Sequence, residues 1–258
     1  MSRPQSGYPA RAETKLAKWR QARGLAHVAP LVVFQIFLLL HQHLKINNPY
    51  LPWWERAPEQ WIYPLQTIVC GALLIWWWRT YRFDRPAGRA LSWAAIAGTV
   101  GIAIWILPCE LHMRFGWGGD DSPLRFLGLI ERPHGFDPQD APYPMAAIAM
   151  RFLRMVVVVA ILEEVFWRGF LMRWLANPDG DIWKTPFGTH HWRAFWGTTL
   201  LVTIIHQPAD YAAAFVWGVL IYLLAVKTRS LTACVVAHGI ANLILGLYAM
   251  RTGYYGFW

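Results

Sequence analysis

The chain is poor in charge and in cysteine, and both shortages narrow its class. Only 15% of its 258 residues are charged, whereas 56% are hydrophobic and the mean hydropathy is +0.27. A soluble domain carries about a quarter charged residues, so this composition predicts a protein that crosses a membrane several times. The cysteines show no CxxC spacing, which argues against a disulfide framework and a thiolate zinc site. We expect them to be small buried side chains; they are Cys70, Cys109 and Cys234.

Two common catalytic motifs are missing as well. The chain has no GxSxG motif, which argues against a serine nucleophile. It has no HExxH motif, so the sequence does not support a metalloprotease of the site-2 type. No internal repeat is visible, which argues against a proton-coupled transporter built from inverted repeats.

The charge that is present is mostly positive. The formal net charge is +9 and the pI is about 9.7. The basic residues stand beside apolar stretches, and the sequence has no signature of a nucleic-acid-binding fold. We therefore attribute the charge to the positive-inside rule and expect no nucleic-acid partner.

Seven apolar stretches are candidates for membrane helices, and they cover residues 26–44, 61–78, 91–109, 144–175, 194–206, 211–226 and 231–250. We expect the first to be an uncleaved anchor, because no small-residue cleavage site follows it. With a cytoplasmic N-terminus, the basic loops 79–89, 173–193 and 227–229 share the cytoplasmic side, and the acidic loop 110–142 lies on the other. The predicted fold class is an all-α polytopic membrane bundle of about seven to eight transmembrane helices.

This interpretation divides the chain into four segments. Residues 1–25 form a cytoplasmic basic tail, and residues 26–142 form the N-terminal transmembrane helices with an extramembrane loop. Residues 143–250 form a second helical region, and residues 251–258 form a short aromatic tail. We expect an integral membrane protein.

Two adjacent acids, Glu163 and Glu164, stand in the middle of a long apolar stretch. Ionisable groups at membrane depth are costly and are kept mainly where they face a polar cavity or a partner. Successive helical residues point about 100° apart, and Arg168 shares a helix face with Glu164. We therefore expect Arg168 to pair with Glu164 and to leave Glu163 free to serve a site. The alternative is that arginines hold both acids for folding alone.

Polar residues of two later stretches are expected at a similar depth. At 1.5 Å per residue, Glu163 and His206 each lie about 18 Å from the cytoplasmic end of their helices. His238 and Asn242 lie at about 12 and about 18 Å, and their spacing of four residues puts them on one helix face. The sequence therefore predicts that these four side chains line a single water-accessible chamber.

Such a set is suited to hydrolysis. A carboxylate can take a proton from water, and a neighbouring histidine can orient that water. Histidine and asparagine N–H groups can stabilise an oxyanion. The same groups could hold a divalent metal through two histidine nitrogens and a carboxylate oxygen, so zinc stays open as a cofactor.

Other polar residues have plainer interpretations. Arg151 and Arg154, near the start of the stretch with the acid pair, fit an interfacial first helical turn. His27 is expected to be interfacial or solvated, as are His43, His112 and His134.

The ordered polar residues resemble the CPBP family of intramembrane proteases, which includes the CAAX prenyl endopeptidases and the Abi or bacteriocin-processing proteins. The motifs EExxxR and HxxxN are intact, whereas FxxxH keeps its histidine but has Val202 in place of phenylalanine. The matching residues are Glu163, Glu164, Arg168, His206, His238 and Asn242. The runs VFWRGFLMRW and RTGYYGFW further resemble the exosortase-associated branch of CAAX protease-like proteins.

The resemblance implies a CPBP-like catalytic core over residues 143–250. It implies an endopeptidase that cuts near the C-terminus of a membrane-associated or lipidated substrate, within the bilayer. The expected partners are a membrane-delivered peptide or lipoprotein and the lipid itself. The alternative function is a non-catalytic immunity or scaffold protein of a protein-sorting system.

The resemblance also implies roles for single residues. Glu163 and His206 would activate water, and His238 with Asn242 would stabilise the oxyanion. Glu164 would belong to the catalytic set as well, with Arg168 as its structural support. We favour a glutamate-activated water, assign no metal ligand, and keep zinc as the alternative.

Overall fold

The structure is a computed structural model that describes residues 22–44, 50–132 and 135–257. Most of the predicted basic tail, residues 1–21, lies outside the described residues, and so do His134 and Trp258. The described residues contain helices and no strand, which confirms the all-α prediction. Five of the helical segments are long and apolar enough to cross a membrane, and the protein is an integral membrane protein.

Each predicted apolar stretch corresponds to a helix. These are α2 (Arg23–Leu44), α4 (Glu59–Trp76), α5 (Gly88–Phe115), a continuous rod over residues 144–176, α9 (Trp192–Ile204), α10 (Tyr211–Thr228) and α11 (Leu231–Thr252). The shorter elements are α3 (Trp53–Arg56), η1 (Trp78–Thr80), η2 (Pro123–Leu127), η3 (Pro138–Asp140), η6 (Pro208–Asp210) and η7 (Tyr255–Phe257).

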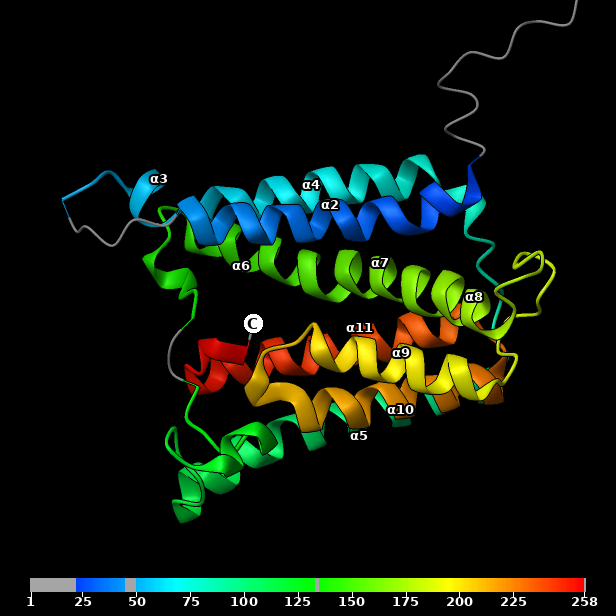
Figure 1. Cartoon of the computed structure of the whole chain (residues 1–258). Coiled ribbons are helices and arrows are strands. Elements are labelled where there is room, and N and C mark those ends of the chain that lie inside the picture. The colour runs from blue at the N-terminus through cyan, green and yellow to red at the C-terminus, as the bar shows by residue number, and fades with distance from the viewer. Residues whose placement is uncertain (1–21, 45–49, 133–134, 258) are drawn as a thin grey trace, which may run out of the picture.

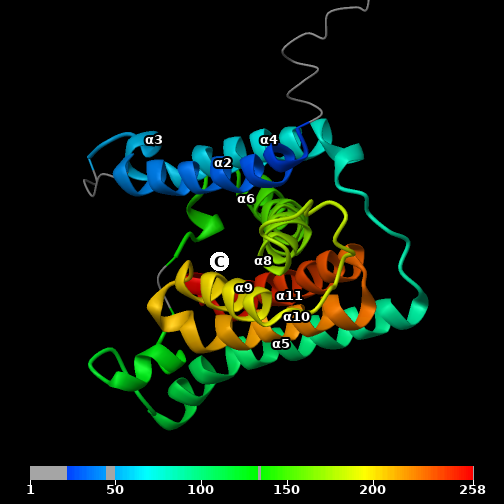
Figure 2. The same cartoon turned by 45° about the vertical axis from the view of Figure 1, so that its right-hand side comes forward.

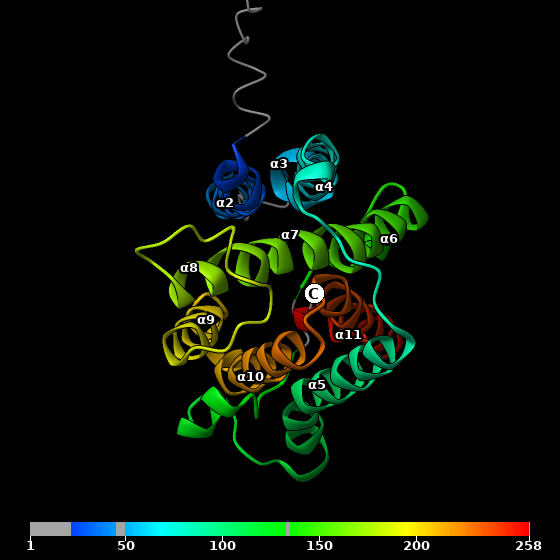
Figure 3. The ribbon, with the colours of Figure 1, turned by 90° about the vertical axis from the view of Figure 1, so that its right-hand side faces the viewer.

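The rod over residues 144–176 is the central helix of the bundle. The pair α2 and α4 covers one side of it, and α5, α9, α10 and α11 lie on the other side (Figure 1, Figure 3). Within the second group, α11 packs along α5, and α10 packs against α9 and α5 (Figure 2). The acid pair of the rod is thereby enclosed by helices on both sides.

The rod is not a regular α-helix. It consists of α6 (Pro144–Phe152), the π-helical η4 (Leu153–Val159), α7 (Ala160–Glu164), the π-helical η5 (Val165–Leu171) and α8 (Met172–Ala176). The two acids thus end a short α-helical stretch between two π-helical ones. Such π-helical segments are rare and frequently mark functional sites, because they re-aim side chains and loosen the backbone hydrogen bonding.

Two glycines allow α5 to approach its neighbours closely. A Cβ atom at Gly98 would lie 2.5 Å from the carbonyl oxygen of Ala237, and one at Gly101 would lie 2.7 Å from the Trp217 ring. Small residues at contacts between membrane helices permit this approach. Ala237 directly precedes His238, so the glycine at position 98 helps to set where that histidine lies.

We predict that Gly98→Ala lowers the stability of the protein by about 1–3 kcal/mol, because the added methyl group overpacks the contact between α5 and α11. The thermal unfolding midpoint in detergent measures this. The matched control is Gly88→Ala at the start of the same helix, where a Cβ atom meets nothing within 4 Å. Alanine there is expected to keep or raise the midpoint. Equal midpoints for the two variants would contradict the close approach.

Candidate active site

A cavity of about 340 Å³ lies between the central rod, α5, α11 and the segment that follows α9. Glu163, His206, His238 and Asn242 all contribute to its lining. The structure therefore brings together the four side chains for which the sequence predicts a common chamber. The other charged or amide side chains in the lining are Gln35, Arg151, Arg154, Gln207 and Asp210.

The two adjacent acids have different surroundings. Glu163 is half-buried, lines the cavity, and makes no hydrogen bond or ion pair with another described residue. Glu164 is fully buried and makes the ion pair with Arg168 that the four-residue spacing predicts. The Arg168 Nε and Nη1 atoms each lie 3.4 Å from a Glu164 carboxylate oxygen. One acid of the pair therefore faces the cavity and the other is held inside the protein.

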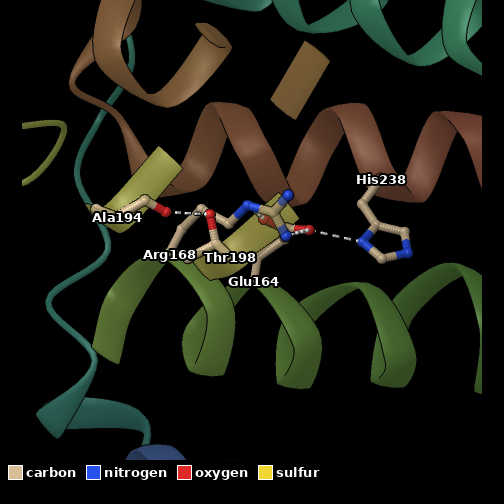
Figure 4. Close-up of polar contacts among 5 residues, drawn as sticks. All are labelled: Glu164, Arg168, Ala194, Thr198 and His238. Atoms are coloured by element: carbon tan, nitrogen blue, oxygen red, sulfur yellow. Dashed lines mark hydrogen bonds and ion pairs between the residues drawn. The ribbon is translucent and has the colours of Figure 1, made fainter. Parts of the chain in front are cut away.

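His238 connects the buried ion pair to the cavity. Its Nδ1 donates a hydrogen bond of 2.8 Å to Oε1 of Glu164 (Figure 4). Figure 4 shows Arg168, Glu164 and His238 as one chain of polar contacts that runs from the central rod to α11. Since the ionised carboxylate only accepts hydrogen bonds, Nδ1 carries the hydrogen and Nε2 is the ring nitrogen left for other contacts. The His238 ring also packs edge-on against Trp217.

His206 lies just beyond the end of a helix. The prediction of a helix through residue 206 was wrong at its end, because α9 stops at Ile204 and His206 follows in a turn. Its Nδ1 donates a 2.6 Å hydrogen bond to the carbonyl oxygen of Val202. That bond leaves Nε2 with an unshared electron pair. Irregular backbone at membrane depth is tolerated where it lines a cavity, and the turn fits that rule.

Asn242 ties α11 to the π-helical part of the rod. Its Nδ2 donates a hydrogen bond of 2.6 Å to the carbonyl oxygen of Met155, which belongs to η4. One side-chain N–H and the side-chain oxygen of Asn242 are left for the cavity that it lines. The bond fixes the orientation of the amide relative to His238, four residues earlier on the same helix.

Three further residues differ from their sequence-based interpretation. Arg151 and Arg154 are not interfacial: they are 5% and 8% exposed and line the cavity. His27 is not solvated, because it is buried against Tyr81 and Trp183. The signal that could have placed the arginines was their position inside an apolar stretch, where a charge is costly unless it faces a polar space.

The cysteine prediction is confirmed, and the zinc alternative finds no support. All three cysteines are buried free thiols. In the part of the chain that the structure describes, no three His, Cys, Asp or Glu side chains are grouped closely enough to hold a metal ion. We therefore derive no step through a metal.

Comparison with known proteins agrees with the motif-based resemblance. Residues 145–244 match the family model described as type II CAAX prenyl endopeptidase Rce1-like. No curated protein and no solved structure matches the chain. The matched segment includes the central rod, the turn with His206 and most of α11. Over residues 145–244, the chain is therefore similar to the Rce1-like type II CAAX prenyl endopeptidases.

Proposed function

We propose that the protein is an intramembrane endopeptidase that hydrolyses a peptide bond near the C-terminus of a membrane-associated or lipidated substrate. The observation that carries this proposal is that one cavity is lined by Glu163, His206, His238 and Asn242. Ionisable side chains at membrane depth are costly, so their presence around one internal cavity favours a function that uses water there. The match of residues 145–244 to a CAAX protease-type family model supports the same reaction class.

Glu163 and His206 activate the attacking water in this proposal. Glu163 makes no hydrogen bond or ion pair with another described residue, so its carboxylate oxygen atoms can accept a proton from water. The Nε2 atom of His206 accepts a hydrogen bond from the same water, since Nδ1 is committed to the Val202 carbonyl. The water oxygen then attacks the carbonyl carbon of the scissile bond, and the proton passes to Glu163.

His238 and Asn242 stabilise the negative charge that forms on the carbonyl oxygen. With a proton on each ring nitrogen, His238 donates from Nε2 while Glu164 accepts from Nδ1. The Asn242 amide contributes its remaining N–H. Donors fixed in advance toward a developing oxyanion typically contribute about 10²–10³ in rate.

Collapse of the tetrahedral intermediate completes hydrolysis. The C–N bond breaks, and the proton held by Glu163 is transferred to the leaving nitrogen. The products are a new carboxylate and a new amine. The net reaction consumes one water and requires no other reactant.

The position of the cavity among membrane helices indicates how a substrate reaches it. A cavity enclosed by membrane helices suits a peptide that the bilayer itself delivers, through a lipid anchor or a transmembrane segment. We propose the inner membrane of a bacterium as the location. The assignment of the chain to the exosortase-associated branch stays a prediction. If it holds, C-terminal sorting peptides are the expected substrates.

We predict that Glu163→Gln lowers the cleavage rate by at least about a hundredfold, because the amide cannot accept the proton of water. The assay uses the purified protein in liposomes with lipidated peptides, and mass spectrometry detects shortened products. Glu131→Gln, at an exposed loop position outside the cavity, is the matched control and should cleave normally. Full activity of Glu163→Gln would overturn the proposed role of the carboxylate.

We predict that Glu164→Gln lowers both activity and stability, whereas Glu163→Gln lowers activity alone. Loss of the Glu164 charge leaves Arg168 buried without a counter-ion, which costs about 3–5 kcal/mol. Thermal unfolding of the two purified variants in the same detergent separates these effects. The assignment of the two acids is wrong if Glu163→Gln is the less stable variant.

A further inference from the structure

Arg154 is a buried charged residue of the cavity that the proposed hydrolysis does not use. It projects from η4 of the central rod, is 8% exposed, and contributes to the cavity lining. Its Nε donates a 2.8 Å hydrogen bond to Oε1 of Gln66, and its guanidinium lies 4.2 Å from the centre of the Tyr63 ring. These contacts hold the side chain in place without neutralising its charge.

No carboxylate in the described residues pairs with Arg154. The acids of the cavity lining are Glu163 and Asp210. Asp210 is bound by Arg132 at 2.7 Å and by Trp105 at 3.1 Å, and Glu163 forms no ion pair with a described residue. A buried charge of this kind is costly unless an opposite charge joins it. The cavity therefore lacks a matching anion at this position.

Arg151 strengthens the positive charge of the same wall. It lies three residues before Arg154, is 5% exposed, and also lines the cavity. Residues three apart share a helix face, so the two guanidinium groups are neighbours of like charge. Burial of neighbouring like charges is unfavourable by itself, and a bound anion would relieve it.

We propose that Arg154, with Arg151 beside it, binds the C-terminal carboxylate of the peptide substrate. The proposal rests on the proposed endopeptidase function and specifies which peptides the site accepts. A guanidinium matches a carboxylate with two parallel N–H···O bonds, and this geometry is stronger than a single contact. The pair thereby selects substrates whose chain ends inside the cavity.

The spacing along the rod is consistent with a free chain end close to the scissile bond. Arg154 stands nine positions before Glu163, which is at most about 13 Å along the rod at the α-helical rise of 1.5 Å per residue, because the π-helical η4 rises less per residue. An extended peptide covers about 3.3 Å per residue. The carboxylate would thus follow the cleaved bond by roughly three or four residues, or fewer once the reach of the arginine side chain is counted.

The test compares peptides that differ only at the chain end. A library of lipidated peptides is made with a free C-terminal carboxylate and with a C-terminal amide, and each pair is assayed with the protein in phosphatidylcholine liposomes. We expect wild-type protein to cleave the acid form with a kcat/KM roughly tenfold to a hundredfold higher. Arg154→Met should bring this ratio close to one. Arg154→Lys should keep part of the preference for the acid form, because the positive charge remains. The preference should be smaller than in the wild type, because lysine cannot make two parallel N–H···O bonds.

Arg251→Met is the matched control, because Arg251 is exposed at the end of α11 and outside the cavity lining. It should keep the wild-type ratio. Equal cleavage of acid and amide peptides by wild-type protein would overturn the carboxylate subsite. So would an acid-to-amide ratio for Arg154→Met that equals the wild-type ratio.

A binding measurement separates this subsite from the proposed reaction. Glu163→Gln protein is titrated with the same peptide pairs, so that hydrolysis is not needed for a signal. Tighter binding of the acid form, lost in Glu163→Gln/Arg154→Met, supports the subsite even if the wild-type protein cleaves nothing. Equal binding of both forms, or binding of neither, overturns it.

A lipid phosphate is the other anion that a bilayer offers to such a site. The peptide assay is therefore repeated in liposomes that contain phosphatidylglycerol. Acid selectivity that persists there supports the peptide carboxylate. Selectivity that disappears, together with phosphatidylglycerol binding that depends on Arg154, would assign the site to a lipid headgroup and overturn the proposal.

Discussion

The buried contact among Arg168, Glu164 and His238 is the interaction on which the rest of the site depends. Glu164 has no exposed surface, and both of its partners are nearly as buried. A charge in such a place is tolerated only when its partners are fixed and close. Because the arginine and the acid lie on the central rod and the histidine lies on α11, the contact also sets the distance between these helices. His238 is thereby held in one orientation, with one ring nitrogen left over.

The remaining geometry follows from the way that the helices meet around this contact. Gly98 lets α5 press against the backbone beside His238, and Asn242 bonds to the carbonyl oxygen of Met155 in the rod. On the other side, the early end of α9 turns His206 toward the same cavity. Glu163 then faces a space whose walls are fixed by packing and by hydrogen bonds, which is the kind of preorganisation that hydrolysis needs.

The sequence predicts much of this from two simple rules. Long apolar stretches locate each helix, because a membrane segment has to bury its backbone polar groups within itself. A four-residue spacing predicts the ion pair between Glu164 and Arg168, and similar depths predict the meeting of His206 and His238 with Glu163. These inferences need only the rise and the turn of a regular helix, so they survive errors of one or two residues at helix ends.

The parts that the sequence does not predict are departures from regular helices. The π-helical segments η4 and η5 have no compositional signature, because apart from one arginine in each they contain the apolar residues of an ordinary membrane helix. The sequence also does not predict that α9 ends at Ile204 rather than at His206. The burial of Arg154 depends on α2 and α4, which supply Phe34 and Gln66 from distant parts of the chain. A pattern of neighbouring residues in the sequence cannot predict contacts between such distant parts of the chain. The segment boundaries and the roles of single residues stay predictions.

The central claim is that one cavity binds the scissile bond between Glu163 on one side and His238 on the other. An experimental structure of Glu163→Gln protein with an uncleaved lipidated peptide tests it most directly. We expect the scissile carbonyl oxygen within about 2.7–3.2 Å of the Nε2 atom of His238, with the carbonyl carbon turned toward position 163. A peptide that lies outside the cavity, or one whose scissile carbonyl points away from His238, would contradict the claim.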